Sequence, residues 1–474
     1  MDARKHGSMS STVLGSQAAV APAARRSVPL PRVWSITGRD IVAILVTNGV
    51  FIGAMWVRHG GLEQVATPGG AWIAIGQVTG LLGTYLALLQ LVLMSRMPWL
   101  DQAFGMDRLA AAHRWIGFAT VWLIAAHGFF IVSGYATSEG ASLVGETWTI
   151  LTTFDFVALA TFGFGLFVVV GVTSMRAARR VVNYETWFAL HLLAYLAIAF
   201  GFLHQLLVGA DFLHDPLARI YWTSLYALTF GLLLAYRVIG PIRLNLRHRF
   251  RVARVVAEGE GVVSIYITGR DLDRLPLRSG QYFVWRFLDG PRWWSGHPFS
   301  ISSAPNGAWI RTTVKALGDD TRRYQRLAVG TRVLLEGPYG VLTGIRRTRR
   351  RVTLIAGGIG VTPLRALVEA LPGRPGDVTL LYRARQPKHV IFRNELDVLA
   401  ERRGIKVHYL VGRRGSVDLP DDPLDAFGLT GLVPDIADHD VYLCGPNEMM
   451  DRLTETLGNL GVPGSRIHVE RFAY

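Results

Sequence analysis

The chain has 474 residues, of which 50% are hydrophobic, and it carries a formal net charge of +15. That length allows two or three domains, and the positive mean hydropathy indicates a membrane protein with a soluble portion attached. A single cysteine, Cys444, excludes an internal disulfide framework and suits a portion that faces a reducing cytoplasm. Because the excess arginines cluster beside apolar segments, lipid and membrane orientation explain the charge, and we expect no nucleic-acid partner.

The N-terminal stretch is rich in Ala, Ser, Pro and Arg and shows no sustained apolar periodicity. We predict a disordered cytoplasmic tail over residues 1–38. No cleavable signal peptide is visible there, because the first apolar run begins only after Asp40.

Six apolar runs follow, and each is near the roughly 20 residues that cross a bilayer. They span residues 40–57, 71–94, 113–134, 153–174, 187–208 and 218–239. Six crossings place both chain ends on the same side, and arginines flank alternate ends of the runs, which assigns that side to the cytoplasm. We therefore predict a six-helix transmembrane domain over residues 39–240. The protein would be a multi-pass protein of the cell membrane, in contact with the lipid bilayer, with its N-terminus and later domains in the cytoplasm.

After Pro241 the pattern changes to short β-rich runs with turn residues between them, which predicts an antiparallel β-barrel over residues 245–345. From Arg351 strands alternate with helical segments, which predicts a parallel α/β domain over residues 350–474. The basic run RRTRRR, residues 346–351, lies between these two modules, and we expect a solvated linker there.

Four of the 13 histidines lie inside long apolar runs, where ionisable side chains are costly and mark candidate functional sites. His113 and His127 are 14 residues apart. An ideal helix separates them by about 21 Å and leaves them about 40° apart around its axis. His191 and His204 are 13 residues apart, which gives about 20 Å and about 140°. Their helix is then overwound, with Gly201 a suitable place, or the rings swing to compensate.

In the predicted orientation, His113 and His191 lie at the inner level of the membrane and His127 and His204 at the outer level. Two neutral imidazoles that face one another across a gap can be the axial ligands of one haem iron, so these four metal ligands predict two stacked b-type haems. The alternative is that the histidines form hydrogen bonds between helices or relay protons. A bis-histidine iron has no free coordination position, so it passes single electrons but does not readily bind oxygen.

The stretch HPFSISSAP, residues 297–305, resembles the flavin-binding motif of ferredoxin reductase-like enzymes, in the form typical of NADPH oxidases and ferric reductases. The resemblance implies that the barrel binds FAD. The implied flavin contacts are His297, Pro298, Phe299, Ser300, Thr313, Lys315, and Gly318 through Thr321. The last of these border the pyrophosphate in the family, and EGPYG at residues 336–340 matches the turn that closes the barrel there.

The stretch GGIGVTP, residues 357–363, follows an apolar strand and precedes a helix. In that context glycines let the backbone approach a pyrophosphate at a helix N-terminus. We predict a Rossmann-like domain in which Gly357, Gly358, Gly360 and Thr362 bind the nucleotide.

Four arginines, Arg383, Arg385, Arg413 and Arg414, resemble the positions at which the family receives the adenosine 2′-phosphate. No acidic residue ends the strand at Tyr382, as recognition of a ribose hydroxyl would require. We therefore predict NADPH rather than NADH, the alternative being that these arginines are ordinary surface residues.

The stretch CGPNEMM, residues 444–450, resembles the family's Cys-Gly-Pro turn, which brings Cys444, Gly445 and Pro446 near the nicotinamide. The alternative for Cys444 is a small buried thiol at a strand end. The terminal ERFAY resembles the family's Glu-x-Phe ending, whose ring covers the flavin and moves so that the nicotinamide can stack. The implied catalytic residues are Cys444 and Phe472, with Tyr474 the alternative ring.

Together these motifs resemble the transmembrane ferric reductase and NADPH oxidase superfamily over residues 39–474. The resemblance implies that NADPH reduces FAD at the cytoplasmic face and that single electrons pass through the inner and outer haems. It also implies an outer acceptor, either dioxygen, which becomes superoxide, or a ferric chelate. Two alternatives stay open, a membrane electron donor to an extracytoplasmic partner reductase and a haem-bearing sensor or anchor. The motifs leave the oligomeric state open.

Overall fold

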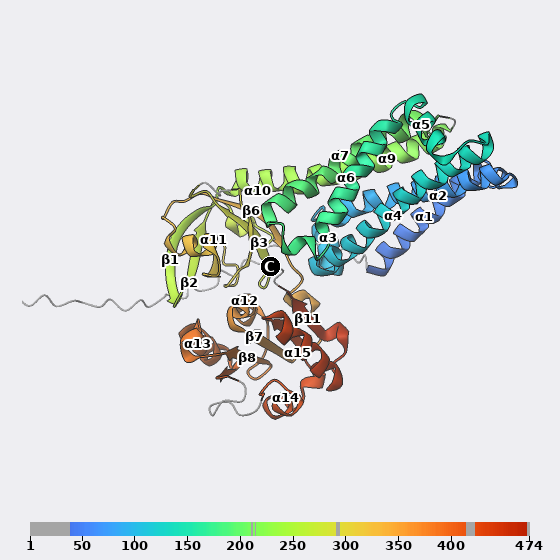
Figure 1. The fold of residues 1–474 in the computed structure, drawn as a ribbon. Coiled ribbons are helices and arrows are strands. Elements are labelled where there is room, and N and C mark those ends of the chain that lie inside the picture. The colour runs from blue at the N-terminus through green and yellow to red at the C-terminus, as the bar shows by residue number, and fades with distance from the viewer. Residues whose placement is uncertain (1–37, 210–211, 214, 291–293, 414–421, 472–474) are drawn as a thin grey trace, which may run out of the picture.

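The structure is a computed structural model that describes residues 38–209, 212–213, 215–290, 294–413 and 422–471. Its helices form an elongated bundle, and two soluble modules lie beside one end of that bundle (Figure 1). Of the predicted tail, only Gly38 belongs to the described residues, as the first residue of a helix.

Six helices of the described chain are long and apolar enough to cross a membrane. They are α1 (Gly38–Arg58), α2 (Pro68–Leu93), α4 (Met106–Glu139), α6 (Val157–Ser174), α7 (Tyr184–Val208) and α9 (Pro216–Leu233). Each coincides with one of the predicted apolar runs, so the predicted six-helix bundle is confirmed. Two shorter helices, α3 (Pro98–Phe104) and α5 (Leu143–Thr153), have no counterpart among these runs because neither is long enough to span a bilayer.

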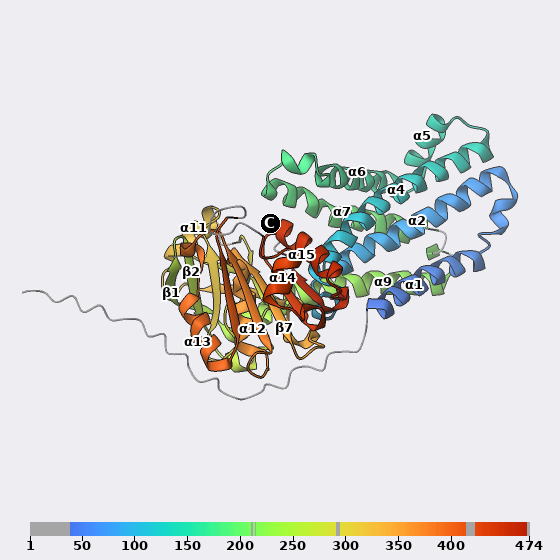
Figure 2. The same ribbon diagram turned by 90° about the horizontal axis from the view of Figure 1, so that it is seen from below.

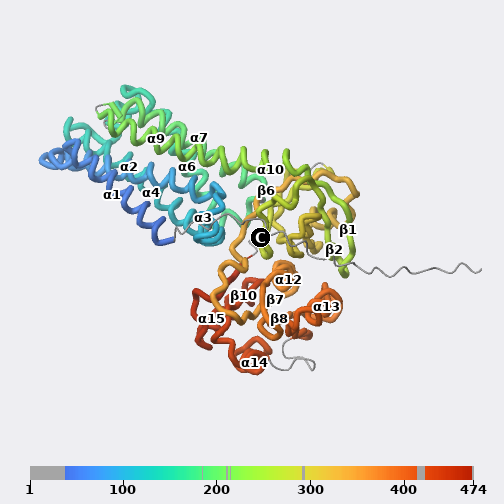
Figure 3. Tube along the Cα trace, turned by 180° about the vertical axis from the view of Figure 1, so that it is seen from behind, coloured from blue at the N-terminus to red at the C-terminus, as the bar shows by residue number. Residues whose placement is uncertain are grey.

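The last membrane helix extends further than the sequence indicates. Helix α9 continues through a π-helical segment, Leu234–Ile239, into α10 (Gly240–His248). The expectation that the helical pattern stops at Pro241 was therefore wrong. Pro241 lies in the first turn of α10, and the wider π-helical turn before it accommodates a residue that has no amide hydrogen. Figure 3 shows α10 leading from the bundle onto the soluble part beside β6.

The first soluble module is the predicted antiparallel barrel. Its strands are β1 (Arg251–Gly259), β2 (Val262–Thr268), β3 (Tyr282–Phe287), β4 (His297–Ser300), β5 (Ile310–Lys315) and β6 (Val333–Tyr339). They form two sheets, ordered β1-β2-β5 and β4-β3-β6. Bridges between Arg251 and Arg332 and between Ile301 and Thr312 join the sheets at both edges. Alternate residues such as Phe283 and Trp285 fill the interior, which gives the closed barrel its own core.

The second module is a parallel α/β domain, as predicted. Its strands β7 (Val352–Gly357), β8 (Val378–Ala384), β9 (Lys406–Val411), β10 (Asp440–Cys444) and β11 (Ile467–Glu470) are ordered β11-β10-β7-β8-β9. All neighbouring strands are parallel. Helices α12 (Val361–Ala370) and α13 (Arg393–Arg403) cover one face, and α14 (Ala426–Leu432) and α15 (Asn447–Asn459) cover the other (Figure 2). Burial on both faces explains why the central strands read as continuous apolar runs.

The basic run at residues 346–351 is solvent-exposed over most of its length, as expected, but its arginines also bind neighbouring elements. Arg346 donates to the carbonyl of Gln102 in α3, and Arg347 donates to the carbonyl of Pro372. Arg350 pairs with Asp377 at 3.2 Å, and Arg351 pairs with Asp435. These arginines therefore tie the connection to the α/β domain and to the membrane bundle.

Candidate cofactor sites

The four membrane histidines lie as two pairs. His113 and His127 are on α4, and His191 and His204 are on α7. The rings of His113 and His191 have centroids 5.8 Å apart, and those of His127 and His204 are 6.5 Å apart. Helix α4 begins after α3, which lies at the end of the bundle that adjoins the barrel (Figure 1). His113 lies in the early turns of α4.

Each histidine pair joins two sets of packed helices, α2 with α4 and α6 with α7. Helix α4 packs closely on α2, and α7 packs closely on α6, whereas α4 and α7 make no extensive contact with each other in the described chain. The two helices meet through their imidazole rings. Facing imidazole rings at two levels, with centroids 5.8 and 6.5 Å apart, are the arrangement that bis-histidine haems require.

The nitrogen of His127 that faces away from its partner ring has a contact typical of metal-bound histidines. Nδ1 of His127 lies 2.8 Å from the carbonyl oxygen of Gly76 in α2. In the tautomer that donates to this oxygen, the lone pair is on Nε2, on the other side of the ring. A Cβ atom at Gly80 would stand 2.6 Å from this Nδ1, so the glycine makes room for the ring.

The remaining rings have fewer contacts of this kind. Nδ1 of His191 lies 3.4 Å from the hydroxyl of Ser174 in α6. Nδ1 of His113 and of His204 are buried without a hydrogen-bond partner, although the Gln90 backbone is close enough to influence His113.

The spacing of 13 residues in α7 does not require a break in that helix. The α-helix runs from Tyr184 to Val208 without interruption, and a Cβ atom at Gly201 would meet nothing within 4 Å. Of the two expected alternatives, this favours different ring orientations over local overwinding.

The predicted flavin motif forms β4, which pairs with β3 so that His297 opposes Trp285 and Ser300 opposes Tyr282. Nε2 of His297 lies 3.1 Å from a carboxylate oxygen of Asp320, and its ring stacks on Phe299. Pro298 is exposed. The Ser300 hydroxyl is buried without a partner, which fits a contact to a ligand.

The second predicted flavin contact begins α11 (Asp319–Arg323). The Thr321 hydroxyl accepts hydrogen bonds from the backbone amides of Leu317 and Gly318, at 2.9 and 2.8 Å. These amides are therefore used within their own turn. Lys315, at the end of β5, is exposed, and Thr313 is buried with its hydroxyl 2.8 Å from that of Ser264.

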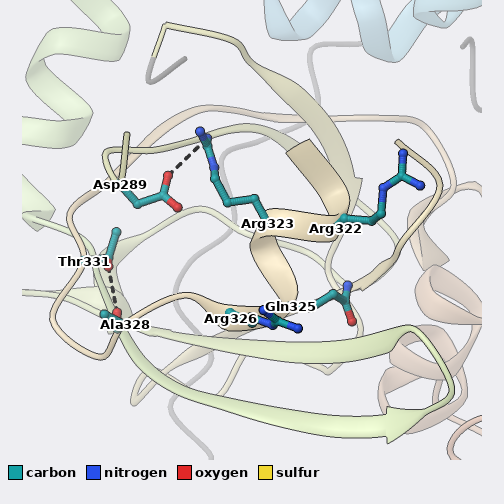
Figure 4. A pocket seen from close by; sticks show the side chains of 7 residues that line it. All are labelled: Asp289, Arg322, Arg323, Gln325, Arg326, Ala328 and Thr331. Carbon is teal, nitrogen blue, oxygen red and sulfur yellow. Dashed lines mark hydrogen bonds and ion pairs between the residues drawn. The ribbon is translucent and has the colours of Figure 1, made fainter. Parts of the chain in front are cut away.

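A pocket of about 750 Å³ opens on the other side of α11 (Figure 4). It is lined by Asp289, Arg322, Arg323, Gln325, Arg326, Ala328 and Thr331, with Arg323 paired to Asp289 at 3.2 Å. None of the predicted flavin contacts is among these residues, so we assign the pocket no cofactor.

The two nucleotide motifs meet at the carboxyl ends of β7 and β10, the adjacent strands at which the sheet order reverses. Such a switch point is where open α/β sheets bind their ligands. A Cβ atom at Gly360 would stand 2.2 Å from the Cys444 carbonyl oxygen, and one at Gly445 would stand 3.1 Å from Gly357. Only glycines allow this close approach of the two turns. Gly358 adds a positive φ of 55°, and Thr362 donates to the Ile359 carbonyl.

Cys444 and Pro446 differ in exposure. Cys444 is fully buried, and burial, followed by the neighbouring Glu470, raises the pKa of its thiol. A neutral buried thiol is not a nucleophile, which favours the expected alternative of a small side chain at a strand end. Pro446 is exposed at the start of α15. The predicted flavin-covering rings, Phe472 and Tyr474, lie outside the described residues.

The arginines predicted to receive the 2′-phosphate are not equivalent. Nη1 of Arg383 donates to the carbonyls of Ala384 and Leu410, at 2.6 and 3.0 Å. Arg385 and Arg413 are exposed. Arg414 lies outside the described residues.

Sequence reasoning missed a buried ion network between the barrel and the α/β domain, which we call the nucleotide junction. Its members are Arg311 of β5, Arg365 and Glu369 of α12, and Glu395 of α13. Arg311 binds Glu395 through two hydrogen bonds, of 2.7 and 3.0 Å, and Arg365 adds a contact of 2.9 Å. Glu369 pairs with Arg365 and accepts a hydrogen bond from the backbone amide of Ala304, near the end of the flavin motif. No local sequence signal marks partners that lie so far apart in the chain.

Three protein families match consecutive parts of the chain. Residues 79–202 match the ferric reductase like transmembrane component, residues 247–343 match an FAD-binding domain, and residues 354–455 match the oxidoreductase NAD-binding domain. Their order is that of the ferric reductase and NADPH oxidase architecture.

Individual relatives match the soluble part. A flavohemoprotein of Chromobacterium violaceum is 33% identical over 47% of this chain and 60% of its own length. Ferredoxin–NADP reductase B of Sorangium cellulosum is 32% identical over 37% of this chain and 77% of its own length. The chain spans about three fifths of the flavohemoproteins that it matches.

A solved structure also resembles this part. The flavohem-like FAD/NAD-binding domain of nitric oxide dioxygenase from Vibrio cholerae is 27% identical, with a TM-score of 0.40, over 48% of this chain and 99% of that domain. The chain is a multi-pass membrane oxidoreductase with the domain architecture of ferric reductases and NADPH oxidases, and its FAD- and NAD-binding portion belongs to the ferredoxin–NADP reductase family.

Proposed function

We propose that this oxidoreductase carries electrons from NADPH on the cytoplasmic side of the membrane, through FAD and two bis-histidine b-type haems, to a one-electron acceptor on the outer side. The observation that carries the proposal is the pairing of His113 with His191 and of His127 with His204, at ring-centroid distances of 5.8 and 6.5 Å. Two such pairs, spaced along helices that cross a membrane, provide two successive electron-carrier sites.

The four imidazoles would hold the haems as axial ligands, and β4 with the Ser300 hydroxyl would hold the flavin. When bound, FAD takes up a hydride and gives up single electrons, which haem iron carries one at a time. The contact between His127 and the Gly76 carbonyl orients that ring and directs its Nε2 away from α2. The paired imidazoles would hold each haem, which would supply single-electron transfer.

The nucleotide would bind where the glycine turn meets the Cys-Gly-Pro turn. Gly357, Gly358 and Gly360 let the backbone approach a pyrophosphate, and the N-terminus of α12 favours its negative charge. We assign NADPH, with the exposed Arg385 and Arg413 receiving the 2′-phosphate, because guanidinium groups bind phosphate with directed hydrogen bonds.

Helix-end arginines such as Arg96, Arg108 and Arg179 support placing the soluble modules in the cytoplasm. The His127 and His204 pair is then the outer one, and the acceptor is reduced beyond it. Dioxygen, reduced to superoxide, and a ferric chelate both accept one electron and both suit an iron without an open position. Donation to an extracytoplasmic partner reductase is the alternative.

The test is anaerobic reduction of the detergent-purified protein by NADPH, followed in the flavin and haem absorption bands. We expect the flavin and then both haems to become reduced, and oxygen or ferric citrate to reoxidise them. If neither acceptor reoxidises the haems, the partner reductase becomes the preferred function. Flavin reduction without haem reduction would contradict the proposed route.

Variants of the paired histidines separate the two levels. His113→Leu should stop electron flow after the flavin, whereas His204→Leu should leave the inner haem reducible and only the outer site empty. His408→Leu, a change in β9 of the α/β domain, is the control and should leave both haem bands intact. Full reduction of two haems in both membrane variants would contradict the ligand assignment.

A further inference from the structure

Strand β6 is the part of the barrel that meets the membrane bundle. The side-chain amide of Asn245 in α10 both donates to the carbonyl and accepts from the amide of Leu335, each at 2.8 Å, as a neighbouring strand would. The amide of Gly340 donates to the Asp101 carboxylate of α3 at 2.8 Å. The barrel is thereby fixed to two separate elements of the bundle.

Between these contacts, one buried carboxylate of β6 binds several arginines. Glu336, whose side chain is 7% exposed, accepts from Arg96 at 2.7 Å, Arg237 at 3.1 Å and Arg286 at 3.3 Å. Burial alone would raise the pKa of this carboxyl, but the three arginines outweigh it and lower the pKa below its ordinary value. Glu336 is therefore a stable anion at the contact surface. We call Glu336, Arg96, Arg237 and Asn245 the membrane junction.

The two arginines that the bundle contributes lie in segments with uncommon backbone conformations. Arg96, in the connection between α2 and α3, has a φ of 60°, a left-handed conformation that non-glycine residues adopt only where their surroundings hold them. Arg237 lies in the π-helical segment that follows α9, and such segments are frequent at functional sites. Both deviations direct a guanidinium group to the same carboxylate of the barrel.

We propose that Glu336 is a positioning residue for electron transfer from the flavin to the nearer haem. This inference rests on the proposed function. Through its arginine partners Glu336 sets the place of the barrel, and with it the flavin motif on β4, relative to the end of the bundle that carries His113 and His191. Because electron transfer slows steeply with distance, a small displacement at this junction reduces that step and no other.

The experiment compares two rates in one anaerobic stopped-flow record of the full protein, flavin reduction by NADPH and haem reduction that follows it. In Glu336→Gln, which keeps the shape and removes the charge, we expect flavin reduction and its dependence on NADPH concentration to stay within about twofold of the wild type. Haem reduction should slow at least about tenfold. Glu336→Asp should recover part of the lost rate. Glu401→Gln, an exposed change on α13, is the matched control and should change neither rate.

Arg96→Gln and Arg237→Gln keep the test decisive if Glu336→Gln loses flavin or haem on purification. Both should slow haem reduction selectively, and the effect of Arg96→Gln combined with Glu336→Gln should be less than the product of the single effects. Haem reduction at the wild-type rate in these variants, or equal slowing of both steps, would overturn the inference. Failure of NADPH to reduce haem in the wild-type protein would instead reject the proposed function.

Discussion

The barrel contacts the rest of the molecule through two junctions that use the same chemistry with different burial. In the nucleotide junction the arginine is enclosed, since Arg311 is 2% exposed, whereas its partner Glu395 is 23% exposed. In the membrane junction the carboxylate is enclosed, but Arg96 is 25% and Arg237 is 34% exposed. Each junction therefore encloses one partner and leaves the other partly exposed: the cation is enclosed in the nucleotide junction and the anion in the membrane junction. Removal of the exposed partner leaves an uncompensated buried charge in either junction.

The enclosed arginine of the nucleotide junction keeps its charge. Burial alone would lower the pKa of Arg311, but its hydrogen bonds to Glu395 raise it, so the pair stays charged. The nucleotide junction thus makes the barrel and the α/β domain one rigid unit around the flavin motif. The membrane junction holds this unit to the bundle through the enclosed carboxylate of Glu336.

The largest expected effect follows from breaking the nucleotide junction. Glu395→Leu leaves Arg311 and Arg365 without their shared carboxylate, and removal of one partner from a buried pair costs about 3–5 kcal/mol. We expect a lower midpoint of thermal unfolding of the soluble modules, measured by flavin fluorescence. Glu401→Leu, on the exposed side of the same helix, should change the midpoint little. Equal losses in both variants would mean that the network does not stabilise the unit.

A pH effect is expected where α3, the segment after β6 and strand β11 meet. Asp101 of α3 and Glu470 of β11 bind the consecutive amides of Gly340, Val341 and Leu342. Burial, and then the charge of Asp101, raises the pKa of Glu470 from 4.5 to about 8. A raised carboxyl pKa gives stability that is present at low pH and is lost as the pH rises through about 8.

The wild-type protein should therefore lose stability between pH 4.5 and about 8, by at most about 1.4 kcal/mol per pH unit from this group. Glu470→Gln stays neutral and should flatten that dependence. The measurement is the unfolding midpoint across this range, with Glu448→Gln, an exposed change on α15, as the control. Identical slopes in the wild type and Glu470→Gln would show that the carboxyl titrates normally.

The smallest effect is expected at a residue outside both junctions. Arg385→Ala should raise the KM for NADPH about tenfold, as the loss of one charge-assisted contact does, and leave the KM for NADH unchanged. Arg383→Ala should impair both nucleotides, because Arg383 holds the backbone of β8 and β9 together. A similar rise for both nucleotides in Arg385→Ala would remove this residue from 2′-phosphate recognition.

The sequence predicts the elements whose cause is local. Apolar runs of bilayer length predict the six membrane helices, and period-two and alternating patterns predict the barrel and the parallel sheet. The spacing of His113 from His127 predicts that both rings face one neighbour, and the histidines do lie in two facing pairs. The glycine turn at residues 357–363 is predictable because its context is a strand followed by a helix.

The sequence does not predict what depends on distant partners. Glu336 meets Arg96 across 240 positions and Glu395 meets Arg311 across 84, so neither carboxylate has a local pattern that marks it. The continuation of α9 past Pro241 depends on a π-helical turn that follows no simple rule. The solvent exposure of residues 346–351 is predictable from their charge, but the carbonyls and carboxylates that bind these arginines come from distant parts of the chain.

The most direct test of the central claim is the haem content of the intact protein. Detergent-purified protein from cells grown with ample iron should contain two b-type haems for each chain, with the low-spin spectrum of iron held between two imidazoles. His113→Leu combined with His127→Leu should remove both while the flavin remains. Protein that retains FAD but shows no Soret absorption would contradict the claim and leave a flavoprotein attached to a membrane domain of another purpose.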